Sequence, residues 1–108
     1  MTVQEFATAC QFNILCCPDP DREINGAYIG DLLSWVMGRA QADNVWITIM
    51  SNINVIAVAS LSDVSCVVLA EDVTLEDDVL NTAKTKGINI LSTPLAAFEI
   101  ANKISGVI

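Results

Sequence analysis

The sequence of 108 residues contains no histidine. This absence excludes Ser-His-Asp and Cys-His catalytic groups, imidazole general bases and metal sites that use a histidine ligand. An enzyme built on this chain would have to work with carboxylates, hydroxyls, thiols and five basic side chains. We therefore predict that the protein is not an enzyme.

Basic residues are also scarce, with five Lys and Arg against thirteen Asp and Glu and a formal net charge of −8. Proteins bind phosphate backbones and anionic membrane surfaces through clusters of Lys and Arg, and this chain has no such cluster. No apolar run approaches the ~20 residues that span a bilayer. The first residues, MTVQEFATACQFN, do not resemble a signal peptide. We expect a cytoplasmic protein with neither nucleic acid nor membrane as a partner.

The four cysteines do not form a C-x-x-C motif, which is the usual spacing of zinc and redox sites. One interpretation is that Cys10, Cys16, Cys17 and Cys66 are reduced, small, buried side chains. The other is a thiol or metal site at Cys16 and Cys17. Neighbouring residues of a strand point to opposite faces, so one metal ion could not easily bind both thiols.

Acidic residues gather between Glu71 and Asp78 and could hold a divalent cation. Their position at the start of a predicted helix is already explained by the helix dipole, which favours negative charge there. The predictions therefore include no metal and no cofactor.

Apolar residues make up 53% of the sequence, which is more than a domain this small can readily bury. We expect a homodimer that covers part of this surface. The surplus concentrates in the helix predicted over 53–61, in Trp35 and in the tail Val107-Ile108. Trp35 lies off the apolar stripe of its own helix, and can be read either as a partly buried flanking residue or as an interface aromatic.

Hydrophobic periodicity predicts helices alternating with short apolar strands. The expected helices cover residues 2–11, 30–42, 53–61, 75–86 and 94–104, and the expected strands cover 12–17, 45–50, 66–70 and 88–91. This order predicts an α/β fold of a single domain, residues 1–108, with a mostly parallel four-stranded sheet and helices on both faces.

Several details of the helices follow from the same patterns. Leu32, Leu33, Val36, Met37 and Ala40 form the inner stripe of the second helix, and the third helix is apolar almost all round and therefore buried on most sides. Thr74 caps the fourth helix, and Pro94 takes the first position of the last helix. Phe98, Ala101 and Ile104 of that last helix face inward.

Polar residues follow the strands, and the carboxyl ends of parallel strands are where ligands bind in open α/β sheets. Ser51-Asn52 and Ser92-Thr93 lead into helix N-termini, which offer free N–H groups to an anion. The stretch NGAYIGD, read as a loop, adds glycines that allow close approach of a ligand. The candidate ligand-binding residues are Gly26, Tyr28, Gly30, Asp31, Thr48, Ser51, Asn52, Asn54, Ser92 and Thr93.

A plainer interpretation stays open for these residues, since helix caps and turns need the same residue types. The phosphate-binding motifs G-x-x-x-x-G-K-S/T and G-x-G-x-x-G are both absent. Nothing in the sequence therefore indicates ATP hydrolysis or phosphoryl transfer.

The stretch from Asp21 to Met37 resembles the DRTGG domain family, most specifically in the pattern G-x-Y-x-GDLLS-x-VM. The run W-I-T-I followed by N-x-N-x-x-A-V-A agrees as well, and the similarity extends over nearly the whole chain. The motif that names the family is replaced here by DREING, in which Asp21, Arg22 and Gly26 remain.

The resemblance implies a regulatory α/β module of the kind that accompanies CBS domains in regulated pyrophosphatases and occurs in some phosphotransacetylases. It also implies a fold similar to the N-terminal domain of HPr kinase/phosphorylase. Short stand-alone versions are similar to proteins encoded near iron-only hydrogenase genes in anaerobic bacteria.

Three functions follow from these observations. The first is a non-catalytic regulatory domain that works as a homodimer and binds a nucleotide or phosphorylated metabolite at the carboxyl ends of the strands. The second is an adaptor subunit that binds a redox enzyme of an anaerobic hydrogenase system. The third is an enzyme or a thiol or metal site that uses Cys16, Cys17 or the acidic cluster.

Overall fold

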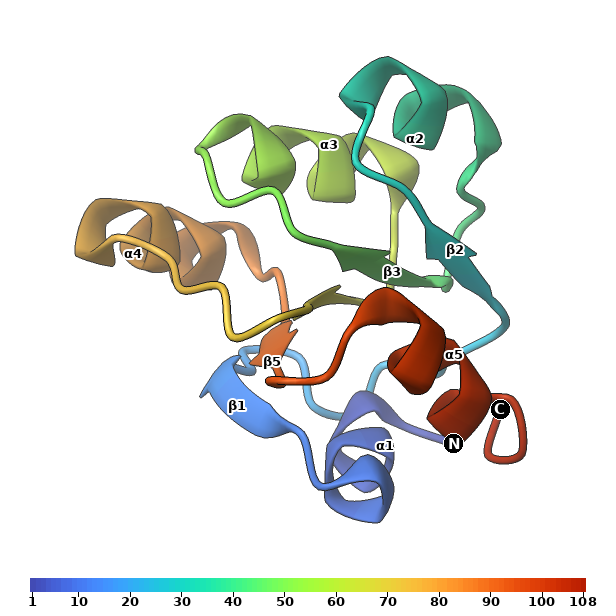
Figure 1. The fold of residues 1–108 in the computed structure, drawn as a ribbon. Helices are drawn as coiled ribbons and strands as arrows, with labels where there is room; N and C mark the ends of the chain where they lie inside the picture. The colour runs from blue at the N-terminus through green and yellow to red at the C-terminus, as the bar shows by residue number, and fades with distance from the viewer.

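A five-stranded sheet forms the centre of the computed structural model, which describes residues 1–108 (Figure 1). The order across the sheet is β1-β5-β4-β3-β2. Strands β2 to β5 run parallel to their neighbours, and β1 pairs with β5 in the antiparallel sense. The strands cover β1 (Asn13–Cys16), β2 (Ala27–Ile29), β3 (Val45–Thr48), β4 (Cys66–Leu69) and β5 (Ile90–Ser92).

Helices cover both faces of the sheet and create two separate cores. The helices are α1 (Val3–Cys10), α2 (Leu33–Arg39), α3 (Asn54–Ser62), α4 (Asp77–Lys86) and α5 (Ala97–Ile104). Helices α2, α3 and α4 pack against one face, where Trp46, Val67 and Ile90 point. Helices α1 and α5 pack against the other, where Ile47, Val68 and Leu91 point. Successive residues of the central strands are therefore buried on opposite sides, as parallel strands require.

The sheet corrects the sequence-based prediction in two respects. It has five strands instead of four, because Ala27–Ile29, which we read as part of a loop, form the edge strand β2. The signal was weak because this strand has only three residues between two glycines. The strand predicted over 12–17 exists as β1, but it is antiparallel to its neighbour. The α/β class and the helices on both faces are confirmed.

The predicted helices exist, but three of them begin later than expected, among them α2, which begins at Leu33 and not at residue 30. Helix α4 begins at Asp77, so Thr74 does not cap it, and α5 begins at Ala97, three residues after Pro94. In all three cases the residue before the helix, Leu32, Glu76 or Ala96, has an extended backbone, so the helix cannot include it.

Burial of the helices is also less complete than predicted. Leu32 and Met37 of the expected stripe are exposed, and so are Ile53 and Leu61 at the two ends of α3. Phe98, predicted to face inward, is 82% exposed, whereas Ile100 and Ile104 on the same helix are buried. A helix on the outside of a layered fold buries one side only, so apolar residues elsewhere on it stay in contact with water.

The cysteines are all free thiols, and Cys10, Cys16 and Cys66 are buried while Cys17 is partly exposed. Burial removes stabilising water from the thiolate and raises the pKa of all four thiols. The effect is largest for Cys66, whose pKa rises to about 12. Separately, none of the five helices has the length and apolar content that would let it cross a membrane.

Candidate functional site

The carboxyl ends of strands β2 to β5 meet at one edge of the sheet, which we call the carboxyl edge. Asp31 follows β2, Thr48 ends β3, and Ser92 ends β5. The parallel register places Thr48 beside Leu69 and Leu69 beside Ser92. The topology thus gathers at this edge most of the candidate residues chosen from the sequence.

Asp31 and Thr48 bind each other across the ends of β2 and β3. The Thr48 hydroxyl donates a hydrogen bond of 2.7 Å to Asp31 Oδ1, and the Ile49 N–H donates to the same oxygen at 3.0 Å. Thr48 Oγ1 in turn accepts a hydrogen bond from the Met50 N–H. These contacts fix the geometry of the edge and leave Asp31 Oδ2 without a partner in the chain.

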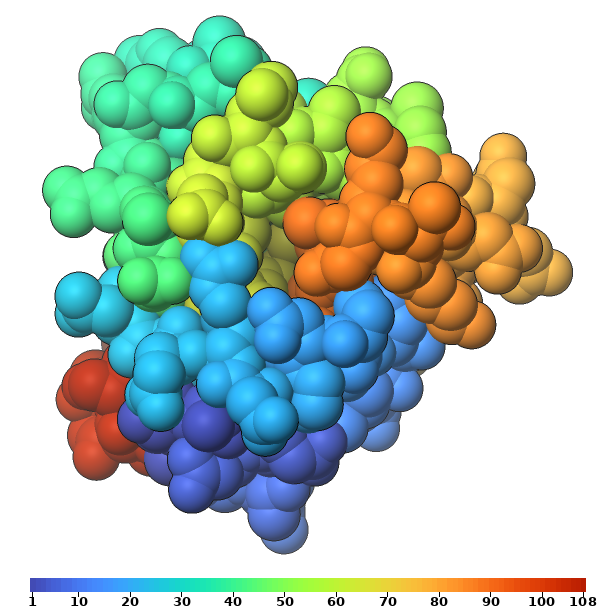
Figure 2. Space-filling model, turned by 180° about the vertical axis from the view of Figure 1, so that it is seen from behind, coloured from blue at the N-terminus to red at the C-terminus, as the bar shows by residue number.

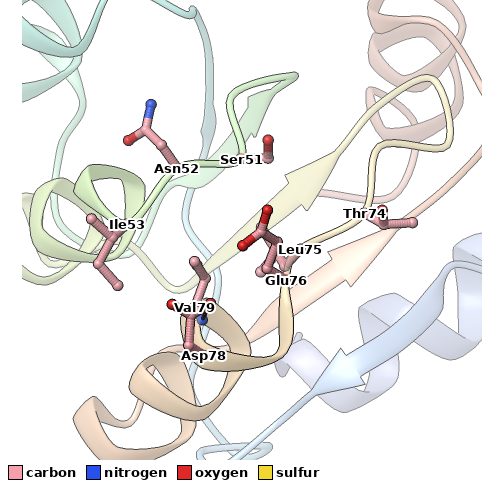
Figure 3. Close-up of a pocket in the computed structure, with 8 residues that line it drawn as sticks. All are labelled: Ser51, Asn52, Ile53, Thr74, Leu75, Glu76, Asp78 and Val79. Atoms are coloured by element: carbon pink, nitrogen blue, oxygen red, sulfur yellow. Dashed lines mark hydrogen bonds between the residues drawn. The ribbon is translucent and has the colours of Figure 1, made fainter.

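The largest cleft in the molecule, of about 540 Å³, opens at the ends of β3 and β4 (Figure 3). Two loops face each other across it, one leading from β3 into α3 and one leading from β4 into α4. The first loop contributes Ser51, Asn52 and Ile53. The second contributes Thr74, Leu75 and Glu76, and the first turn of α4 adds Asp78 and Val79. The cleft therefore offers hydroxyl, amide and carboxylate groups beside three apolar side chains.

Sequence reasoning identified only one wall of this cleft. Ser51 and Asn52 were candidates, whereas Thr74 and the carboxylates of Glu76 and Asp78 were interpreted as a helix cap and a dipole effect. Their position after β4 was a usable signal, because every parallel strand delivers its following loop to the same edge. Asn52 also has a structural role, since its Oδ1 accepts a hydrogen bond of 2.9 Å from the Asn54 N–H.

The remaining candidates at this edge serve the fold. Ser92 and Thr93 are buried, and neither lines the cleft. Thr93 extends the sheet through backbone hydrogen bonds to Leu69 and Asp72, and its hydroxyl accepts one from the Leu95 N–H at 3.3 Å. Ser92 and Thr93 therefore help to form the turn that leads from β5 to α5.

The glycines and Tyr28 are explained by packing around β2. The indole N–H of Trp46 donates a hydrogen bond of 2.9 Å to the Gly30 carbonyl. A Cβ at Gly30 would lie 2.8 Å from the ring of Tyr28, so any larger residue here would require that ring to move. Gly26 lies at the opposite end of β2, at the amino edge of the sheet, with a φ of 76° that favours glycine.

Carboxylates dominate the carboxyl edge, and no basic side chain lines the cleft. Arg22 lies at the amino edge, Lys84 and Lys86 end α4, and Arg39 sits 3.7 Å from the centre of the Trp35 ring. Lys103 lies over Phe12 on the other face of the sheet. An anion entering the cleft would therefore meet N–H and hydroxyl groups but no side-chain cation.

Glu71 and Asp72, directly after β4, adopt left-handed backbone conformations with φ of 56° and 62°. Their N–H groups donate hydrogen bonds of 2.9 Å to Leu95 and Thr93, which holds the turn in place. Both side chains are exposed, and neither carboxylate accepts a hydrogen bond within the chain. Left-handed backbone costs energy for residues other than glycine, and the hydrogen bonds of this turn offset that cost.

The amino edge is held by Arg22. Its guanidinium donates hydrogen bonds of 3.0 and 2.8 Å to Asp43 Oδ1 before β3, and of 2.7 and 2.9 Å to the carbonyl and carboxylate of Asp63 before β4. Partial burial lowers the pKa of Arg22, but the hydrogen bonds to the two carboxylates outweigh it and raise that pKa above its usual value. Figure 2 shows the light-blue loop after β1 against the green and yellow-green segments that it joins.

This geometry limits the chemistry that the chain can perform. No three side chains of His, Cys, Asp or Glu gather in an arrangement that could hold a metal ion. The hydroxyls of Ser51 and Thr74 make no hydrogen bond to a carboxylate that would activate them as nucleophiles.

Comparison with known proteins begins with one solved structure of similar fold. It is the crystal structure of the CBS and DRTGG domains of the regulatory region of Clostridium perfringens pyrophosphatase, complexed with the activator diadenosine tetraphosphate. The TM-score is 0.70 at 13% sequence identity, and the match covers 95% of this chain and 45% of that one. At this identity the likeness concerns the fold alone, and this chain spans less than half of its neighbour.

No curated protein matches the sequence. The model of the DRTGG domain family does match it, over residues 7–107. That match covers nearly the whole chain, so the resemblance noted from the residues is confirmed and this chain belongs to the DRTGG domain family.

Proposed function

We propose that this chain is a non-catalytic regulatory domain that senses a small phosphorylated ligand, such as a nucleotide, in the cleft at the carboxyl edge. The observation that carries the proposal is the position of the cleft, at the ends of β3 and β4 where parallel sheets bind ligands. Its volume of about 540 Å³ lies in the range that accommodates small molecules and cofactors. Ser51, Asn52 and Thr74 supply neutral donors and acceptors.

The negative charge of the cleft limits the form in which a phosphorylated ligand can bind. Glu76 and Asp78 repel free phosphate, and no Lys or Arg compensates them. Magnesium is commonly held by one or two carboxylates together with phosphate oxygens. The ligand therefore enters as its magnesium complex, in which the phosphates supply most of the ligands to the ion.

A regulatory role is supported by family membership and by the absence of an activated nucleophile. The solved structure of similar fold comes from a regulatory region that carries an activator, a dinucleotide. We further propose that the domain acts as a homodimer in the cytoplasm. An adaptor role towards a hydrogenase-type redox enzyme is the second candidate, and the observation that favours it is the exposed Trp35 on α2.

Thermal unfolding in the presence of ligands tests the proposal. The panel is AMP, ADP, ATP and diadenosine tetraphosphate, each with magnesium chloride and each with EDTA. A ligand at about 100 times its Kd stabilises the folded state by about 2.7 kcal/mol, which raises the Tm by about 10 °C. We expect this rise for at least one nucleotide with magnesium and none with EDTA.

Variants of the cleft locate the site. Thr74→Trp fills the cleft and should abolish the shift, whereas Asn81→Ala, on the exposed side of α4, should leave it intact. Glu76→Gln should weaken the requirement for magnesium. The proposal is wrong if no nucleotide shifts the Tm under either condition, or if Thr74→Trp responds like the unmodified chain.

A further inference from the structure

Helices α2 and α3 lie side by side (Figure 1), and both carry large apolar side chains that are exposed. Trp35 is 53% exposed and Leu61 is 73% exposed. We call the exposed apolar surface of this helix pair the α2–α3 face; its residues are Leu32 and Trp35, three positions apart at α2, and Leu61 on α3. Exposed apolar residues grouped on neighbouring elements indicate an interaction site.

Helices α2 and α3 carry no acidic side chain, in a chain whose net charge is −8; Asp31 and Asp63 flank them. The seven residues of α2 and the nine of α3 include no Asp and no Glu. Their one charged residue is Arg39, which stacks on Trp35. Six carboxylates, by contrast, lie at or near the carboxyl edge: Asp31, Glu71, Asp72, Glu76, Asp77 and Asp78.

We propose that the α2–α3 face binds a second copy of this chain, with α2 and α3 of one protomer packed against the same helices of its partner about a two-fold axis. The proposal specifies the surface of the homodimer suggested above, and it does not depend on the ligand. Two copies of an acidic chain repel each other, so their contact must use a face without carboxylates. The α2–α3 face meets this requirement.

The charge distribution also argues for a second copy over other partners. A basic partner would be attracted to the carboxylates of the carboxyl edge and not to the α2–α3 face. An acidic partner would meet only one cation at the α2–α3 face, Arg39. A nearly neutral apolar face is complementary to itself, which is what a two-fold interface needs. Trp and Arg, here already stacked, are among the residues that contribute most binding energy at interfaces.

The mass of the full chain in solution, measured by analytical ultracentrifugation across a concentration series, tests this proposal. We expect a species of twice 11.6 kDa. Because salt screens the repulsion between two acidic copies, added sodium chloride should tighten the dimer. A chain that stays at 11.6 kDa at every concentration and salt level overturns the proposal.

Matched variants identify the face. Leu61→Ser and Trp35→Ser change exposed side chains and should each weaken the dimer at least tenfold, with an unchanged circular dichroism spectrum. Phe98→Ser is the control, because Phe98 is exposed to a similar degree but lies on α5, on the other face of the sheet. A second control is Ile29→Ser, beside an apolar groove between β2 and α5.

Dissociation by Phe98→Ser or Ile29→Ser, with Leu61→Ser and Trp35→Ser still dimeric, would place the interface elsewhere and refute the proposal. The nucleotide panel is repeated on Leu61→Ser. A monomeric Leu61→Ser that keeps the ligand-induced Tm shift supports both proposals separately. A dimer without any ligand response supports the interface and counts against the sensing function alone.

Discussion

The two edges of the sheet use acidic residues in opposite ways. At the amino edge, Asp43 and Asp63 adopt left-handed backbone conformations, and their carboxylates accept hydrogen bonds from Arg22. At the carboxyl edge, Glu71 and Asp72 have the same backbone conformation, but their carboxylates face solvent without a partner.

This difference separates residues that build the fold from residues available to a ligand. The arginine of the segment that resembles the family motif, together with Gly26, belongs to the amino edge. A motif that names a family therefore contributes here to stability, at the end of the sheet opposite the cleft. The cleft lies instead among loops whose side chains leave polar groups unused.

The largest expected effect comes from Arg22→Ala, which removes the four side-chain hydrogen bonds of Arg22 and leaves the carboxylates of Asp43 and Asp63 without this partner. Hydrogen bonds to charged groups contribute roughly 1.5–3 kcal/mol when buried, and here both aspartates are substantially exposed. We expect a loss of about 2 kcal/mol in the free energy of unfolding, measured by urea denaturation.

Two comparisons make this prediction specific to the contacts of Arg22 with Asp43 and Asp63. Arg22→Lys keeps the charge but loses the forked geometry, so it should recover only part of the stability. Lys86→Ala, an exposed change at the end of α4, should stay within about 0.5 kcal/mol of the unmodified chain. Equal stability of Arg22→Ala and Lys86→Ala would contradict the role assigned to the amino edge.

The next effect is a loss of stability at alkaline pH from Cys66, which begins β4 at the amino edge. Its folded-state pKa is raised by burial to about 12 from an ordinary value of 9.0. Between these pH values the unfolded chain loses the thiol proton and the folded chain keeps it, so the unfolded state binds fewer protons. Stability is full below about pH 9 and falls as the pH rises, by up to about 1.4 kcal/mol per pH unit.

Thermal unfolding between pH 8 and pH 10.5 measures this dependence. Cys66→Ala should show a shallower decline than the unmodified chain, because the other three thiols are less strongly shifted. Parallel curves for the two proteins would show that Cys66 does not control the alkaline loss.

The smallest expected effect has the opposite sign. Glu71→Gly relieves a left-handed conformation and removes no hydrogen bond of the side chain, so it should stabilise the fold by about 0.5–1 kcal/mol. The same change at the other edge, Asp63→Gly, gives up a bond to Arg22 and should destabilise it. Urea denaturation of both variants tests the comparison directly, and a loss of stability in Glu71→Gly would remove the distinction between the edges.

Local patterns predicted those parts of the fold in which one segment carries a strong signal. The run VWITIM predicted β3, and the alternation of apolar strands with amphipathic helices predicted the α/β class. Strand β2 was missed because three residues between glycines carry too little pattern, and they become a strand only by pairing with β3. Phe98 was misplaced because periodicity shows that a helix has an apolar side but not how much of that side a neighbour covers.

Only one side of the candidate site could be predicted, because the sequence does not show which loops meet in the fold. Ser51 and Asn52 were found because they follow a strong strand directly. Glu76 and Asp78 were interpreted as acidic residues that the helix dipole favours at a helix start. That interpretation accounted for their position without any other part of the fold. Only the packing of α3 beside α4 brings the two loops to one cleft.

The sequence by itself determined the α/β class, the family and the exclusion of histidine chemistry, because these depend on composition and on order along the chain. Tertiary structure decided which way β1 runs, which edge receives the carboxylates, and which apolar side chains remain exposed. These features depend on contacts between residues that are distant in sequence. The contacts of Arg22 with Asp43 and Asp63, for example, exist only once the strands have assembled.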